Sequence, residues 1–130
     1  MKLIVLIKRK PGLSKEEFRN HYEGIHADLA LQFIRPYLID YRRSYPTSAF
    51  SYFDTVERSP GKVVPRFDYD CVTEMWFENQ TRMEEMFALL STDNVRRAIA
   101  EDEERFIDPQ SVVVITCDES RSRIDVAGQR

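Results

Sequence analysis

The two histidines of the sequence, His21 and His26, are the side chains best suited to proton transfer near neutral pH. Both lie in the segment KRKPGLSKEEFRNHYEGIHADLA, residues 8–30, which predicts a helix. At about 100° per residue, one apolar face of that helix comprises Phe18, Tyr22, Ile25, Leu29 and Phe33. His26 falls at the inner border of this face, where an imidazole can act as a general acid or base, or can bridge backbone groups at a helix end. His21 falls at the opposite border, and we expect it to be solvated.

Polar side chains on the predicted strands can complete a site around His26. Tyr41 lies on one strand and can donate a hydrogen bond to a developing enolate oxygen. Glu74 shares one face of another strand with Trp76. A carboxylate there must either line a polar pocket or pair with an arginine such as Arg42.

Aromatic side chains are expected to surround a bound substrate. The ones that we expect in contact with it are Tyr22, Phe33, Trp76, Phe50 and Phe53. Tyr22 and Phe33 also fit the plainer interpretation of core residues. Phe50 and Phe53 belong to a long segment, residues 46–66, which we expect to act as a lid because loops of this length are usually functional or disordered.

The sequence predicts neither a metal nor a cofactor. Two histidines five positions apart lack the spacing of a helical zinc pair. The four glycines stand alone at positions 12, 24, 61 and 128, so no phosphate-binding loop is expected. A single helical histidine can ligate haem iron, which is the weakest of these alternatives. The acidic residues 101–104 are expected to form a solvated helix face.

Helix and strand signals divide the chain into six elements. Strands are predicted at residues 3–8, 37–45, 69–77 and 111–117. The first helix begins at Ser14, which forms a capping box with Glu17, and ends before Pro36. The second helical region begins after Asn79, restarts at residue 93 or 94, and ends before Pro109.

This order, β-α-β-β-α-β, predicts an α+β, ferredoxin-like fold with an antiparallel four-stranded sheet. Its helices cover one face of the sheet. Residues 3–7 and 112–115 are nonetheless apolar at consecutive positions, whereas a sheet with one wet face alternates apolar and polar residues. We therefore expect a second copy of the chain to cover the other face, giving a homodimer.

Length and composition narrow the class of protein. The 130 residues suit one domain, residues 1–117, followed by a polar tail, residues 118–130. A net charge of -3 without a basic block argues against nucleic-acid binding, and no apolar run approaches the length of a membrane span. Cys71 and Cys117 lack the spacing of a redox or metal motif, so we expect free thiols in the reducing cytoplasm.

Three segments resemble the EthD family of dimeric α/β-barrel proteins: residues 8–30, FDYDCVTEMWF (67–77) and EDEERFID (101–108). The resemblance covers most of the chain, although residues 46–66 are longer than usual and Asp28 stands where the family's His-Ala is commonly followed by proline. It implies that His26 is the motif histidine. It also marks Asp108 as a family position, where the carboxylate can hold an imidazole in one tautomer or cap the turn at Pro109.

The resemblance implies fold more firmly than reaction, because EthD-like proteins include lyases of polyketide-like aromatics and accessory proteins of ether degradation. We expect a cofactor-independent lyase (dehydratase, decarboxylase or cyclase) that acts on a small, apolar, aromatic or polyketide-like compound, with His26 moving the proton and Glu74 or Asp108 orienting it. One alternative is a cofactor-free monooxygenase of phenols, and another is a non-enzymatic accessory or ligand-binding protein.

Overall fold

A four-stranded antiparallel sheet organises the residues that the computed structural model describes, which are residues 1–50 and 66–125. The strands are β1 (Lys2–Ile7), β2 (Asp40–Ser44), β3 (Cys71–Trp76) and β4 (Val113–Cys117). Their spatial order is β2-β3-β1-β4, with β1 paired to both β3 and β4. The order and the antiparallel pairing confirm the predicted ferredoxin-like α+β fold.

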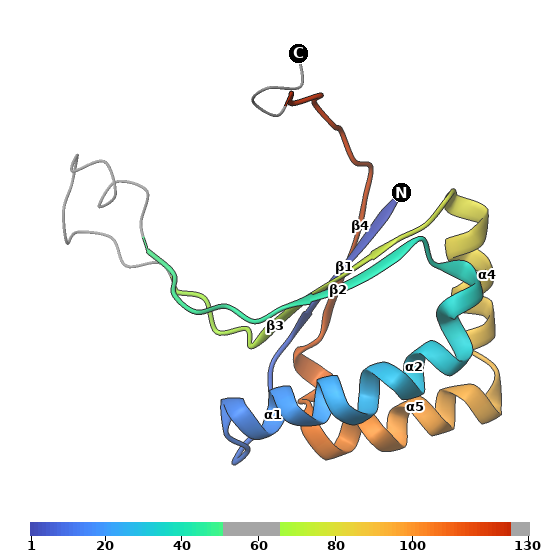
Figure 1. Cartoon of the computed structure of the whole chain (residues 1–130). Helices are drawn as coiled ribbons and strands as arrows, with labels where there is room; N and C mark the ends of the chain where they lie inside the picture. Colours follow the sequence, from blue (N-terminus) through green and yellow to red (C-terminus); the bar gives the residue numbers. More distant parts are fainter. Residues whose placement is uncertain (51–65, 126–130) are drawn as a thin grey trace.

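The helices of the described residues lie together on one side of this sheet (Figure 1). They are α1 (Lys15–His21), α2 (Ala27–Ile34), α4 (Gln80–Leu90) and α5 (Asp93–Phe106). A wide turn, η1 (Tyr22–His26), joins α1 to α2 without a break. Short 3-10 turns, η2 (Arg35–Tyr37) and η3 (Pro109–Ser111), lead into β2 and β4.

Side-chain caps start the helices where the sequence predicts them. The hydroxyl oxygen of Ser14 accepts a hydrogen bond from the Glu17 amide at 3.0 Å, and the Glu17 carboxylate accepts one from the Ser14 amide at 3.1 Å. These two bonds complete the expected capping box. Asn79 caps α4 by accepting from the amide of Arg82 at 3.0 Å. Each cap thereby satisfies at least one backbone amide that lacks a partner within the helix.

The first helix departs from the predicted periodicity at η1. The amide of Ala27 donates to the carbonyl of Tyr22, five residues earlier, which defines a π turn with one extra residue. Beyond it the buried face moves forward by one position. Ile25, expected in the core, is 53% exposed, whereas His26, Ala30 and Ile34 are buried. The expectation for Ile25 was wrong because it assumed a regular α-helix.

The core between sheet and helices consists of two clusters of buried side chains. The first gathers around Phe18, Tyr22 and Phe106 at the α1 end of the sheet. The second gathers around Leu3 and Met86, beneath α2 and α4. Val5, in the middle of β1, packs against both clusters.

The opposite face of the sheet is uncovered in the described part of the chain. Strand pairing places Ile4, Leu6, Val113 and Ile115 together on this face, and Val113 and Ile115 are each 39% exposed. Aliphatic side chains on an open sheet face favour coverage by another surface.

Two predicted segments fall partly outside the described residues. Residues 51–65, which include Phe53, and residues 126–130 lie outside them, so the predicted lid and the end of the predicted tail stay predictions. Phe50, at the edge of the described region, is 69% exposed. Among the described helices, none has the length and apolar composition needed to cross a membrane.

Two glycines offer a matched test of backbone conformation. A Cβ at Gly24, inside η1, would meet no atom within 4 Å, whereas Gly12 has a φ of 88° that side chains with a Cβ rarely adopt. We expect Gly24→Ala to raise the free energy of unfolding by about 0.5–1 kcal/mol and Gly12→Ala to lower it by about 1 kcal/mol. Urea denaturation measures both. Equal effects of the same sign would contradict this account.

Candidate functional site

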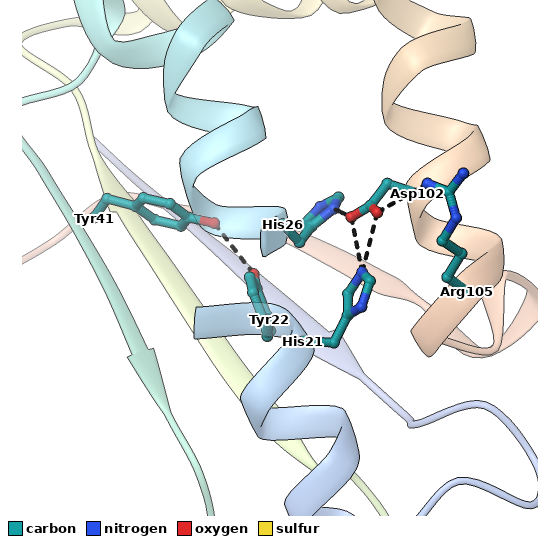
Figure 2. A network of polar contacts seen from close by, with 6 residues as sticks. All are labelled: His21, Tyr22, His26, Tyr41, Asp102 and Arg105. Carbon is teal, nitrogen blue, oxygen red and sulfur yellow. Dashed lines mark hydrogen bonds and ion pairs between the residues drawn. The ribbon is translucent and has the colours of Figure 1, made fainter. Parts of the chain in front are cut away.

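A buried carboxylate, that of Asp102 on α5, is the centre of a polar network between the helices (Figure 2). Asp102 is 1% exposed. Its oxygens lie 2.7 Å from Nδ1 of His26 and 3.0 and 3.1 Å from Nε2 of His21. Nη1 of Arg105 lies 3.2 Å away, one turn further along α5. Three side chains therefore donate to one buried carboxylate.

The π turn explains how both histidines reach the same carboxylate. Residues five apart on a regular α-helix point about 140° away from each other. The extra residue in η1 widens the turn, so that His21 and His26 both face Asp102 across the helix interface (Figure 2). His21 also stacks on Phe106, with ring centroids 4.7 Å apart. The expectation of a solvated His21 was therefore wrong.

The hydrogen bond to Asp102 fixes the tautomer of His26. An ionised carboxylate only accepts hydrogen bonds, so Nδ1 of His26 carries a proton and donates it. In the neutral ring, Nε2 then holds the free lone pair on the side away from Asp102. Such a carboxylate–imidazole pair orients a general base.

His26 lines a cavity of about 210 Å³ between the sheet and the helices. Most of its wall is aliphatic or aromatic and comes from both core clusters, including Leu3, Ile34, Met86 and Leu90. Val114 on the edge strand β4 lines the cavity and is 52% exposed. The polar side chains in the wall are Tyr22, His26, Tyr41, Thr73 and Glu103.

The hydroxyl groups of the wall form a short chain. The Tyr22 hydroxyl lies 2.7 Å from Oγ1 of Thr73 and 3.3 Å from the Tyr41 hydroxyl. The Arg43 guanidinium lies over the Tyr41 ring, 4.6 Å from its centroid. Burial raises the pKa of both tyrosines, so their phenols stay protonated and can donate hydrogen bonds. Tyr22 and Tyr41 thus line the same cavity as His26.

Burial lowers the pKa of His26 below 6.5, although the Asp102 carboxylate opposes this shift. The neutral imidazole, which can accept a proton, is therefore the dominant form at pH 7. Burial alone would raise the pKa of Asp102, but the hydrogen bonds from His26, His21 and Arg105 outweigh it and hold that pKa below 3.8. The carboxylate thus stays ionised wherever the imidazole is neutral.

Two predicted catalytic carboxylates lie elsewhere. Glu74 alternates with Thr73 and Met75 on β3, so it faces the open side of the sheet, where it pairs with Lys2 rather than with Arg42. Asp108 caps η3 by accepting from the amide of Gln110 at 3.2 Å. The capping interpretation of Asp108 is therefore confirmed, and its proposed contact with an imidazole was wrong because Asp102 makes that contact.

Three predicted aromatic contacts also fall away from the cavity in the described part of the chain. Trp76 lies on the open face of the sheet and donates from Nε1 to Glu119 at 2.9 Å. Phe33 packs against the second core cluster instead of lining the cavity, because the π turn shifts the buried face. Phe50 is exposed. Phe53 lies outside the described residues.

Asp102 and Glu103 are the site residues that sequence reasoning missed. Both belong to the acidic stretch 101–104, which was expected to be solvated. The helical spacing of Ile99, Asp102, Glu103 and Phe106 nevertheless predicts one common face. That face packs against the sheet and η1, whereas Glu101 and Glu104 are exposed. Within residues 1–50 and 66–125, no group of three His, Cys, Asp or Glu side chains is arranged to hold a metal ion.

Comparisons with known proteins agree with this architecture. The EthD domain family matches residues 10–110. An EthD family protein from Bacillus halodurans has a similar structure, with a TM-score of 0.60 at 19% identity over 92% of this chain and 97% of that one. The Arabidopsis thaliana protein At3g17210 gives a TM-score of 0.57 at 18% identity, over 95% and 98% of the two chains. No curated protein matches the sequence.

Asp102→Asn tests the carboxylate as the support of His26. We expect this variant to lower the pKa of His26 further, because the wild-type carboxylate favours the imidazolium, and to lower the free energy of unfolding by about 1–3 kcal/mol, because the buried donors lose a charged acceptor. NMR titration of the histidine Cε1 protons and urea denaturation measure the two effects. Glu104→Gln, an exposed neighbour, serves as the control. A higher pKa of His26 in Asp102→Asn would contradict the assignment.

Proposed function

The chain belongs to the EthD family, and on this premise we propose that it is a cofactor-independent lyase acting on a small, largely apolar compound. One observation carries the proposal: His26, held at Nδ1 by the buried Asp102, lines an apolar cavity with its other nitrogen free within the described residues. A neutral, oriented imidazole beside a substrate is suited to general acid–base catalysis, which contributes about 10²–10⁴-fold to a rate.

The cavity wall supports removal of a proton from carbon. In a β-hydroxy ketone, Nε2 of His26 takes the proton next to the carbonyl, and the C–H electron pair forms an enolate. The enolate oxygen accepts a hydrogen bond from the Tyr41 phenol, which the high pKa keeps protonated. The enolate then expels the hydroxyl group, which leaves as water once protonated, and a conjugated ketone remains. Decarboxylation and aldol-type cyclisation pass through the same enolate.

Cavity size supports a substrate with one ring. Pockets for drug-sized ligands span about 300–1,000 Å³, and this cavity has about 210 Å³. Its aliphatic wall and the aromatic ring of Tyr22 favour an apolar or aromatic body, and its few polar groups favour a carbonyl or hydroxyl function. We therefore assign the substrate to small aromatic or polyketide-like ketones.

We further propose that the protein acts as a homodimer in the cytoplasm. Ile4, Leu6, Val113 and Ile115 form an aliphatic patch on the open sheet face, and a second copy is the simplest surface to cover it. Cys71 and Cys117 are both free, which is typical of a reducing compartment.

His26→Gln tests the enzymatic proposal. The aldol adduct of benzaldehyde and acetone is a suitable probe, because its dehydration to benzylideneacetone is followed by ultraviolet absorbance. We expect the wild type to accelerate this dehydration and His26→Gln to slow it by about 10²–10⁴-fold. Because the neutral imidazole is the base, kcat/KM should fall as the pH drops below 6.5.

The controls separate this reaction from other functions. Arg96→Gln, on the exposed surface of α5, should leave turnover unchanged. An oxygen electrode should record no consumption with the probe, since consumption would indicate a monooxygenase. Equal rates for the wild type and His26→Gln would overturn the acid–base role.

Ile115→Lys tests the dimer. A lysine on the aliphatic patch would bury a charge in the interface, so we expect this variant to sediment as a monomer in analytical ultracentrifugation, whereas the wild type sediments as a dimer. Ile124→Lys, at a position that is 81% exposed, is the control and should remain dimeric. A monomeric wild type would contradict the proposal.

A further inference from the structure

Among the described residues, Glu103 is the one carboxylic acid in the cavity wall, and the proposed reaction leaves it unused. It follows Asp102 on α5, about 100° further around the helix, so the two carboxylates point in different directions. Asp102 faces the histidines, and Glu103 lines the same cavity as His26. The imidazole of His26 and the Glu103 side chain therefore both face this cavity, one from η1 and the other from α5.

The surroundings of Glu103 offer its carboxyl group little to bind. Within the described residues, its side chain makes neither an ion pair nor a hydrogen bond, in contrast to Asp102, which receives bonds from three side chains. The wall around it includes Ile99, Val112 and Val114. A carboxyl group in such a wall is stabilised in its neutral form, and it finds a hydrogen-bond partner when a polar ligand enters.

Burial, together with the negative charge of Asp102, raises the pKa of Glu103 above 4.5. The other ionisable groups that face the cavity are His26, Tyr22 and Tyr41. The same apolar wall that favours the neutral form of His26 therefore also favours the protonated form of Glu103 relative to a solvated glutamate. A base and a carboxyl group then face one cavity, which is the arrangement that a reaction with one proton removed and one delivered requires.

We propose that Glu103 is the general acid of this site, which delivers a proton to the oxygen of the leaving group while His26 removes the proton from carbon. This assignment rests on the proposed function. In the β-hydroxy ketone, the Glu103 O–H bond breaks as its proton joins the departing hydroxyl oxygen, and the C–O electron pair leaves with that oxygen as water. His26 ends as imidazolium and Glu103 as carboxylate. Transfer of the proton from imidazolium to solvent and from solvent to Glu103 restores both.

Glu103→Gln tests the acid, because glutamine keeps the size and a hydrogen-bond donor but has no proton to transfer. We expect turnover of the benzaldehyde–acetone adduct to fall by about 100-fold or more, while the dissociation constant for benzylideneacetone changes less than about 3-fold. The alkaline limb of the pH–rate profile should disappear. Glu104→Gln is the matched control, since Glu104 is exposed on the same helix, and it should match the wild type.

An infrared titration provides a readout that does not depend on turnover. The carbonyl band of a protonated carboxyl group, present in the wild type near pH 6 and missing from Glu103→Gln, should shift to lower frequency when benzylideneacetone binds. If Glu103 is already ionised at that pH, or if its carbonyl band does not shift when the ketone binds, the assignment is overturned, even if the probe is not a substrate.

Normal turnover in Glu103→Gln with an inactive His26→Gln overturns the role of Glu103 alone. Normal turnover in His26→Gln overturns the proposed function itself.

Discussion

The architecture of the site depends on keeping one buried carboxylate ionised. A carboxylate removed from water is strongly destabilised unless hydrogen-bond donors replace the solvent, and Asp102 receives those donors from His21, His26 and Arg105. Two of these donors lie on the first helix, His21 at the end of α1 and His26 in η1. The carboxylate therefore fixes the distance between α5 and the first helix, and it sets the tautomer of His26 at the same time.

The π turn is the local feature that makes this arrangement possible, and it also explains which predictions failed. β2 begins at Asp40, three residues after its predicted start, because Tyr37 belongs to the turn η2. The starts of the first helix and of α4 were predictable because side-chain caps act over short distances. The extra residue in η1 was not, since no short-range rule identifies it. Each predicted core position after the turn was one residue early: the helix buries His26, Ala30 and Ile34 where Ile25, Leu29 and Phe33 were expected. The same shift moves His26 from the border of the apolar face into the core.

The residues of the site were predictable to different degrees for physical reasons. Tyr22 and Tyr41 reach the cavity because their positions follow from the helix and the strand that carry them, whereas His26 reaches it through the π turn. Glu74 and Trp76 share a face, as predicted, but which face of β3 meets the helices depends on pairing with β1 and β2. Asp102 was missed because it belongs to a stretch of acidic residues. Four consecutive acidic residues indicate a solvated surface, yet α5 turns only part of that stretch outward.

The cavity is lined by side chains from both buried clusters, so a bound compound would contact the sheet and the helices at once. A compound that binds in this cavity binds only the folded protein, so its binding raises the free energy of unfolding. Abundance of the folded protein in a cell would then rise with the supply of its ligand, because binding lowers the fraction of unfolded chain that proteases can cleave.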